Sequence, residues 1–244
     1  MSPAETLVLL VVLCGLLAVL AYKFKLLSAS GSIASIAVGL TIGWFGSISW
    51  LLILIVFVLL GFLVTRYKIQ LKMAGGLQEG KRGERTYRNV LANGFVPLVI
   101  ALVSYSLDLQ NELIAQIAYL SAISVAAADT TASELGVLSP RTYLITNFNR
   151  VAPGTNGGIS LAGTIWAVIA ATFASIIGWL AIVPGMSIDV MVVIPIFAGV
   201  SGCMIDSFIG ATLENRGFVS KLGTNVISML AGTVIAVSIF QMVQ

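Results

Sequence analysis

Eight apolar runs along the chain limit what it can fold into. A helix that spans a bilayer needs about 20 apolar residues, within a range of roughly 17 to 25. The runs cover residues 5–22, 31–46, 49–66, 91–107, 113–128, 159–180, 190–206 and 223–243. Only 9% of the residues are charged, against about 25% in a typical soluble domain. We therefore predict an all-α integral membrane protein, in which residues 1–244 form a single polytopic bundle of seven or eight transmembrane helices. The lower number allows for the run 31–46, which is short and rich in glycine.

The basic residues are distributed asymmetrically between the connections. Every one of the 13 lysines and arginines falls in the first, third, fifth or seventh connection, which are residues 23–30, 66–90, 129–158 and 207–222. If all eight runs cross, these connections share one side of the membrane. The positive-inside rule makes that side cytoplasmic and leaves both termini outside. Residues 67–90 are predicted to form a basic cytoplasmic loop.

Two aspartates differ from the other acidic residues because each ends a long apolar run. Asp129 follows the run 113–128, and Asp206 is the last residue of the run 190–206. A carboxylate so close to hydrocarbon is costly, and such residues usually have a function. Histidine is absent, which excludes imidazole as a base, metal ligand or pH switch. The two cysteines are isolated from each other and form neither a zinc pattern nor a disulfide framework.

Three polar segments on the predicted cytoplasmic side suggest phosphate chemistry with a divalent metal. Mg²⁺ binds one or two carboxylates together with substrate phosphates, and glycines before a helix can expose backbone amides to an anion. Each segment alone has a simpler interpretation. The glycine stretch is also typical of a turn, and the basic loop is also typical of contact with anionic lipids. Their combination favours a functional site. The segments are residues 128–136, 150–160 and 206–215.

The same segments resemble the signature blocks of the phytyl-phosphate kinase family of integral membrane proteins. The likeness is carried by Asp129-Thr130-Thr131-Ala132-Ser133-Glu134-Leu135-Gly136, Gly154-Thr155-Asn156-Gly157-Gly158-Ile159-Ser160 and Asp206-Ser207-Phe208-Ile209-Gly210-Ala211. Weaker likenesses lie at Arg88-Asn89-Val90-Leu91-Ala92-Asn93-Gly94 and Ser28-Ala29-Ser30-Gly31. The resemblance implies transfer of a phosphoryl group from CTP to an isoprenyl monophosphate such as phytyl or geranylgeranyl phosphate. The products would be the prenyl diphosphate and CDP.

This hypothesis assigns roles to individual residues. Asp129 and Asp206 are expected to hold Mg²⁺, with Glu134 as a supporting catalytic acid. Substrate and nucleotide are expected to contact Arg82, Arg85, Arg88, Asn93, Thr130, Ser133, Arg150, Gly154, Thr155, Asn156, Gly157, Gly158, Ser207 and Asn225. CTP is the expected co-substrate, and a prenyl phosphate embedded in the bilayer is the expected acceptor.

The predicted location is a cell or thylakoid-type membrane, with the active site on the cytoplasmic side. No nucleic-acid partner is expected, and the sequence is compatible with a homo-oligomer. Two other functions stay open at this point. One is a transporter or flippase for an anionic lipid or metabolite. The other is a cytidylyltransferase that acts on a lipid phosphate.

Overall fold

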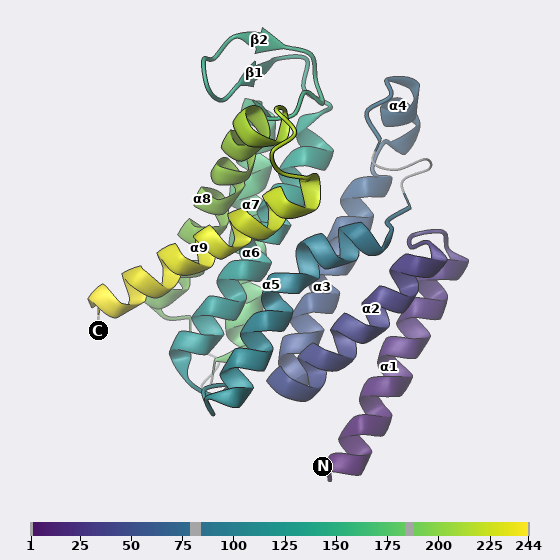
Figure 1. The fold of residues 1–244 in the computed structure, drawn as a ribbon, viewed down its shortest axis with the longest axis vertical. Helices are drawn as coiled ribbons and strands as arrows, with labels where there is room; N and C mark the ends of the chain where they lie inside the picture. Colours follow the sequence, from purple (N-terminus) through teal and green to yellow (C-terminus); the bar gives the residue numbers. More distant parts are fainter. Residues whose placement is uncertain (1, 79–83, 184–187, 244) are drawn as a thin grey trace.

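The computed structural model describes residues 2–78, 84–183 and 188–243, and it is a bundle of long helices (Figure 1). Eight helices in these residues are long and apolar enough to cross a membrane, as the sequence predicts. They are α1 (Pro3–Lys23), α2 (Ala29–Thr41), α3 (Ile48–Arg66), α5 (Tyr87–Ser106), α6 (Leu113–Gly136), α7 (Leu161–Ile182), α8 (Val193–Ile209) and α9 (Lys221–Val243).

Short helical segments extend or connect these helices. The π-helical turn η1 (Ile42–Gly46) lengthens α2, so the glycine-rich second run forms a full candidate span. The 3₁₀ turn η2 (Val190–Val192) precedes α8, and the π-helical turn η3 (Gly210–Glu214) continues it. The short helix α4 (Ile69–Ala74) lies in the basic connection after α3.

Serine caps fix where several helices begin. The hydroxyls of Ser28, Ser47 and Ser160 accept hydrogen bonds from backbone amides in the first turns of α2, α3 and α7. Such caps satisfy amides that have no partner within the helix. Ser160 also donates to the carbonyl of Gly136, 3.3 Å away, and so ties the end of α6 to the start of α7.

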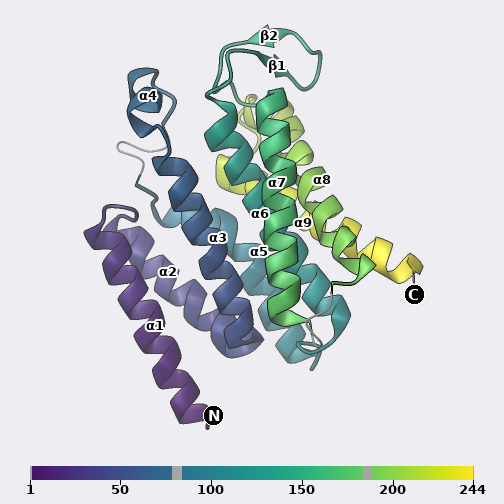
Figure 2. The ribbon, with the colours of Figure 1, turned by 180° about the vertical axis from the view of Figure 1, so that it is seen from behind.

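Helix α6 is the centre of the bundle. It contacts α3, α5, α7, α8 and α9, and the two views show it between α5 on one side and α7 on the other (Figures 1 and 2). Small residues allow this close approach. A Cβ added at Gly199 of α8 would lie 2.1 Å from the Ser124 hydroxyl of α6. A similar approach brings Gly202 of α8 and Gly232 of α9 against Val125. Most residues of α6 are therefore shielded from lipid.

Two helices extend well past their predicted ends. Helix α6 continues to Gly136 instead of ending at residue 128, and α8 with η3 continues to Glu214 instead of ending at residue 206. Asp129 and Asp206 therefore lie within continuous helices, and not at the edge of a loop. At the end of α6 the reason is burial, because Thr130, Thr131 and Glu134 are surrounded by protein and avoid the penalty that a polar residue would meet in hydrocarbon.

The connection between α6 and α7 contains a small antiparallel sheet that the sequence did not indicate. Its strands are β1 (Thr142–Leu144), β2 (Arg150–Val151) and β3 (Gly158–Ile159), in the order β2-β1-β3. Tyr143 pairs with both Arg150 and Ile159. The sheet and α4 stand at the same end of the bundle, and both chain termini lie away from that end (Figure 1).

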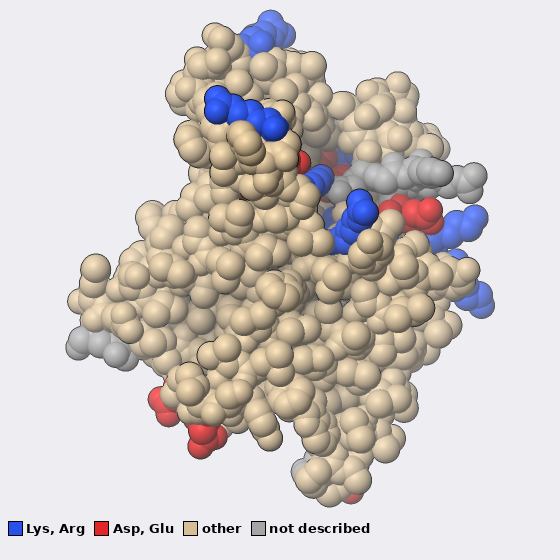
Figure 3. Space-filling model, in the orientation of Figure 1, with Lys and Arg blue, Asp and Glu red and all other residues tan. Residues whose placement is uncertain are grey.

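The charged residues are also divided between the two ends of the bundle. In the face shown by Figure 3, the lysines and arginines gather toward the end that carries the sheet and α4, which is hollowed between them. At the opposite end lie Glu5 in the first turn of α1 and the acids Asp108 and Glu112 between α5 and α6. The described residues thus keep the charge asymmetry that the connections predicted.

Candidate functional site

A polar cavity of about 930 Å³ opens at the basic end of the bundle. Its walls come from α5, α6, α8, α9 and the connection that carries the sheet. Most of the residues expected to form the site line this one cavity. They are Arg85, Arg88, Asn93, Asp129, Thr130, Ser133, Glu134, Gly154, Thr155, Asn156, Gly157, Gly158, Asp206, Ser207 and Asn225. The structure therefore brings together segments that are distant in the sequence.

Asp129 on α6 and Asp206 on α8 lie next to each other in the wall of the cavity. Their side chains lie within hydrogen-bonding reach, since α6 and α8 pack directly against each other. The hydroxyl of Ser228 on α9 donates to Oδ1 of Asp206 at 3.0 Å. Two adjacent carboxylates cannot both stay ionised without a compensating cation or a shared proton. The pair therefore fits a divalent cation.

Asp129 and Asp206 could contribute carboxylates to a cation in this cavity. Among the described residues, no group of three or more His, Cys, Asp or Glu side chains is placed to hold a metal ion. Mg²⁺ characteristically takes only one or two carboxylates and completes its shell with water and substrate phosphates. Glu214, which also lines the cavity, accepts a hydrogen bond from the Thr224 hydroxyl at 2.7 Å.

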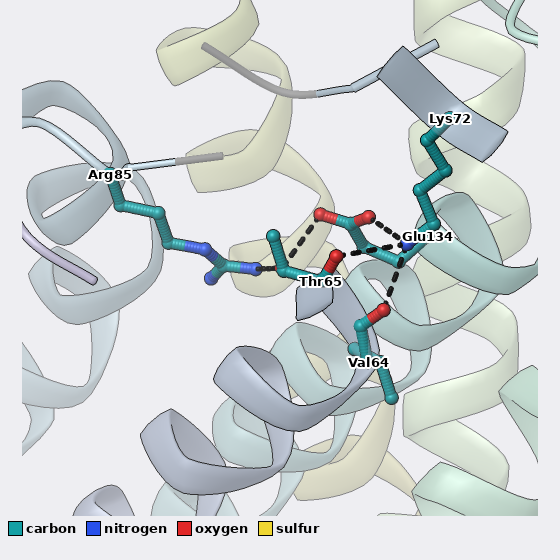
Figure 4. A network of polar contacts seen from close by, with 5 residues as sticks. All are labelled: Val64, Thr65, Lys72, Arg85 and Glu134. Atoms are coloured by element: carbon teal, nitrogen blue, oxygen red, sulfur yellow. Dashed lines mark hydrogen bonds and ion pairs between the residues drawn. The ribbon is translucent and has the colours of Figure 1, made fainter. Parts of the chain in front are cut away.

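Glu134 makes contacts that the sequence did not predict (Figure 4). Its Oε2 forms an ion pair with Nζ of Lys72 at 2.7 Å, and its Oε1 accepts a hydrogen bond from the Thr65 hydroxyl at 2.7 Å. Nζ of Lys72 also donates to the carbonyls of Val64 and Thr65. Both carboxylate oxygens of Glu134 are occupied, and the side chain is buried. Glu134 therefore fastens α4 to α3 and α6, and we do not place it among the metal ligands.

The same network reaches an arginine of the cavity wall. Nη2 of Arg85 donates to the Thr65 hydroxyl at 3.2 Å. The backbone of Arg85 is held by hydrogen bonds with Leu26 and Ser28, which precede α2. A Cβ at Gly31 would lie 2.6 Å from the carbonyl oxygen of Arg85. The serine-glycine block therefore positions Arg85 through close backbone contact.

Close backbone contact also explains why glycines occur in residues 154–158. Gly157 has a φ of +76°, and a Cβ there would lie 2.4 Å from Cβ and 2.6 Å from the backbone nitrogen of Ala211 in η3. Nδ2 of Asn215 donates to the carbonyl of Asn156 at 3.3 Å. The amide of Gly158 donates to the carbonyl of Thr155 at 2.8 Å. The Gly158 amide is thus engaged within the turn, and the glycines mainly seat this turn on η3.

Comparison with known proteins identifies the family. Residues 12–235 match the family described as integral membrane protein DUF92. The chain belongs to this family. An uncharacterized membrane protein of Methanocaldococcus jannaschii is 34% identical over 95% of this chain and 92% of its own length. Protein PGR of Arabidopsis thaliana is 31% identical, with coverage of 90% and 83%.

A third relative bears on the resemblance drawn from the aspartate blocks. The chloroplastic protein VTE6 of Arabidopsis thaliana is 29% identical over 89% of this chain and 66% of its own length. Membership of DUF92 is consistent with the resemblance to phytyl-phosphate kinases inferred from the sequence. No solved structure matches the chain.

One predicted contact of this DUF92 protein falls outside the cavity. Arg150 lies on β2 and is not among the lining residues, because its Nη2 is directed to the carbonyl of Pro140 at 3.3 Å. We therefore leave it out of the site. Arg82 lies outside the described residues.

Other residues of the site were missed by the sequence reading. Lys221 at the start of α9 and Asn89 on α5 line the cavity. In the sequence alone, Lys221 looks like a basic residue that only sets the orientation in the membrane. Its place in the cavity depends on the packing of α9 against α8. Asn89 stands one helical turn before Asn93, and that spacing was the available signal. Asn93 itself accepts a hydrogen bond from Nδ2 of Asn225 at 3.3 Å, which links α5 to α9.

Proposed function

We propose that this DUF92 protein is a membrane kinase that transfers the γ-phosphoryl group of CTP to an isoprenyl monophosphate. An oxygen of the acceptor phosphate attacks the γ-phosphorus. The bond from that phosphorus to the oxygen bridging it to the β-phosphorus then breaks, which yields the prenyl diphosphate and CDP. The observation that carries the proposal is the adjacent pair Asp129 and Asp206 in a polar cavity at the basic end of a membrane bundle.

Charge in the cavity suits two phosphorylated substrates. Arg85, Arg88 and Lys221 line it, and cations in such positions neutralise phosphate oxygens. Phosphoryl transfer depends mainly on positioning and on stabilising charge. Asp129 and Asp206 would hold Mg²⁺, which would supply further neutralisation of the phosphate oxygens when bound. In the proposed orientation, this site faces the cytoplasm.

The reaction does not require a histidine base. The attacking group is a phosphate oxygen that is already ionised near neutral pH, so general-base catalysis has little to contribute. The chain contains no histidine, and the proposal needs none. The acids lie in a cavity at the basic end of the bundle, which favours this proposal over a transporter, whose site is expected near the bilayer midplane.

The reaction class can be tested with CTP labelled in either of two positions. Purified protein would be incubated with Mg²⁺, geranylgeranyl phosphate and CTP labelled at the γ- or the α-phosphorus. A kinase transfers only the γ-label to the lipid and releases CDP. Transfer of the α-label with release of pyrophosphate would instead identify a cytidylyltransferase. If neither label reaches any prenyl phosphate, the enzymatic proposal is overturned.

The aspartate pair can be tested in the same assay. Asp129→Asn and Asp206→Asn keep the shape of the side chain but remove the charge that would hold the metal. We expect each to lower kcat by roughly 10²–10³-fold, the size of effect seen when one electrostatic contribution is lost. Asp108→Asn is the matched control at the opposite end of the bundle, where its φ of +55° suits asparagine. Normal turnover by the Asp206→Asn protein would contradict the metal assignment.

A further inference from the structure

A second, apolar cavity lies between the first helices of the bundle. It has a volume of about 320 Å³ and is lined by α1, α2, α3 and the first half of α5. Its walls are mainly aliphatic and aromatic, and they include Leu17, Leu20, Leu51, Val58 and Phe62. Three of its lining side chains, Leu20, Phe24 and Leu59, are also exposed on the outside of the bundle. The cavity is therefore a groove that faces the hydrocarbon of the membrane.

The groove runs lengthwise through the bundle. Along α3 it extends from Leu51 to Phe62, a distance of about 16 Å at the rise of an α-helix. That is roughly half the thickness of a bilayer core. At its deep end, α1, α2 and α3 converge, because a Cβ at Gly39 would lie 2.9 Å from Cys14 Sγ and 3.5 Å from Leu51 Cδ1. The three helices are therefore close together at this end of the groove.

Its other end meets the polar cavity. Arg85, Asn89 and Asn93 line both spaces. Nε of Arg85 is buried and has no hydrogen-bond partner within the described residues, so a donor is available at this junction. Asn93 is bonded to Asn225 on α9. Ser228 follows one turn later on α9 and donates to Asp206. The groove therefore adjoins the polar cavity that also contains Asp129 and Asp206.

We propose that this groove binds the prenyl chain of the acceptor, with the terminal phosphate passing Arg85 and Asn93 into the polar cavity. This inference rests on the proposed function and adds where the lipid chain lies. A single chain ending in a phosphate matches one apolar groove that opens into one cationic cavity. A bilayer phospholipid fits less well, because it carries two chains and its phosphate is esterified on both sides. Because α1, α2 and α3 converge at Gly39, we expect the groove to discriminate between acceptors by chain length.

Filling the groove tests the proposal. Val58 on α3 lines the groove and is partly exposed, so Val58→Trp should occupy the space of the chain. We expect the KM for geranylgeranyl phosphate to rise about tenfold or more, since losing the burial of about two methylene groups has that effect. The KM for dimethylallyl phosphate, which has a single isoprene unit and so buries much less of the groove, should change less. Leu63→Trp is the matched control, because Leu63 is on the same helix, is 71% exposed and does not line the groove.

A second variant covers the case in which Val58→Trp does not fold. Leu17 lines the groove from α1, so Leu17→Trp should give the same selectivity for chain length without altering α3. If either folded variant affects long and short acceptors equally, the groove is not the chain site, and the kinase proposal still stands.

Photolabelling separates this inference from the reaction itself. A geranylgeranyl phosphate analogue with a diazirine at the chain terminus should label residues of α1 and α3 in the groove, and unlabelled geranylgeranyl phosphate should compete. This readout needs no turnover, so labelling without kinase activity would overturn the proposed function and retain the groove. Labelling elsewhere in the bundle would overturn the groove. So would a phospholipid that copurifies in the groove and is not displaced by the prenyl phosphate.

Discussion

Lys72 has no exposed side-chain surface, and its ammonium group lies among the oxygens of Glu134, Val64 and Thr65. Such a charge is tolerated only because every direction around it holds an acceptor. Glu134 is satisfied in turn by Lys72 and the Thr65 hydroxyl. The pair links the short helix α4 to the core of the bundle. At the scale of single residues, this ion pair supports the cavity wall beside Arg85.

Removing one partner of this pair should destabilise the protein strongly. Lys72→Met leaves the Glu134 carboxylate buried and uncompensated, and we expect a loss of about 3–5 kcal/mol in the free energy of unfolding. Lys72→Met combined with Glu134→Leu removes both charges and should recover part of that loss. Chemical unfolding in detergent micelles, followed by circular dichroism, measures all three proteins. Lys23→Met, at an exposed position, is the control and should change stability by less than about 0.5 kcal/mol. A double variant less stable than Lys72→Met would contradict this account.

At the scale of elements, the turn 154–158 and η3 fit together through their glycines. Gly157 approaches backbone atoms of Ala211, whereas Gly154, with a φ of +81°, approaches only the end of the Leu77 side chain at 2.9 Å. The two glycines therefore share the left-handed backbone but differ in what surrounds them. The Gly157 contact holds the sheet connection against the end of α8, and with it one wall of the cavity.

This difference predicts unequal effects of the same substitution. Gly154→Ala should cost about 1–3 kcal/mol, the usual penalty of a non-glycine residue in the left-handed region. Gly157→Ala pays this penalty and must also displace the backbone of Ala211, so its unfolding temperature should fall further. Adding Ala211→Gly should rescue Gly157→Ala only partly, because the Cα and nitrogen of residue 211 remain 2.6 Å away. Thermal unfolding in detergent compares the three proteins, and equal melting temperatures for the two single variants would refute the contact.

The helices and strands also show which parts of the fold could be predicted from the sequence. Apolar runs were sufficient to predict all eight spans, because hydropathy reports on lipid. They were insufficient to predict that α6 and α8 continue past Asp129 and Asp206, because the apolar pattern ends at these two residues. The strands of the small sheet are two or three residues long, too short for an alternating pattern. The resemblance identified the aspartate and glycine blocks, but the place of Lys72 and the junction at Arg85 depend on how distant helices pack.

At the scale of the whole molecule, the two cavities divide the bundle between them. Helices α6, α8 and α9 carry the aspartates and their partners, whereas α1, α2 and α3 form most of the apolar groove. Helix α5 belongs to both, because its Asn89 and Asn93 line both spaces. This arrangement fits the proposed reaction between a water-soluble nucleotide and a lipid. The nucleotide would enter the polar cavity from water, and the lipid would enter the groove from the membrane.

The orientation of the bundle gives the last prediction. The positive-inside rule predicts that the sheet, α4 and the polar cavity face the cytoplasm and that both termini lie outside. In a variant with Cys14→Ala and Cys203→Ala, a single cysteine would be introduced at Gln241 near the C-terminus or at Asn147 between β1 and β2, both exposed positions. A maleimide that cannot cross membranes should label Gln241→Cys in intact cells and Asn147→Cys only after permeabilisation. The reverse pattern would place the cavity outside the cell, where CTP is not supplied, and would count against the kinase proposal as well as the topology.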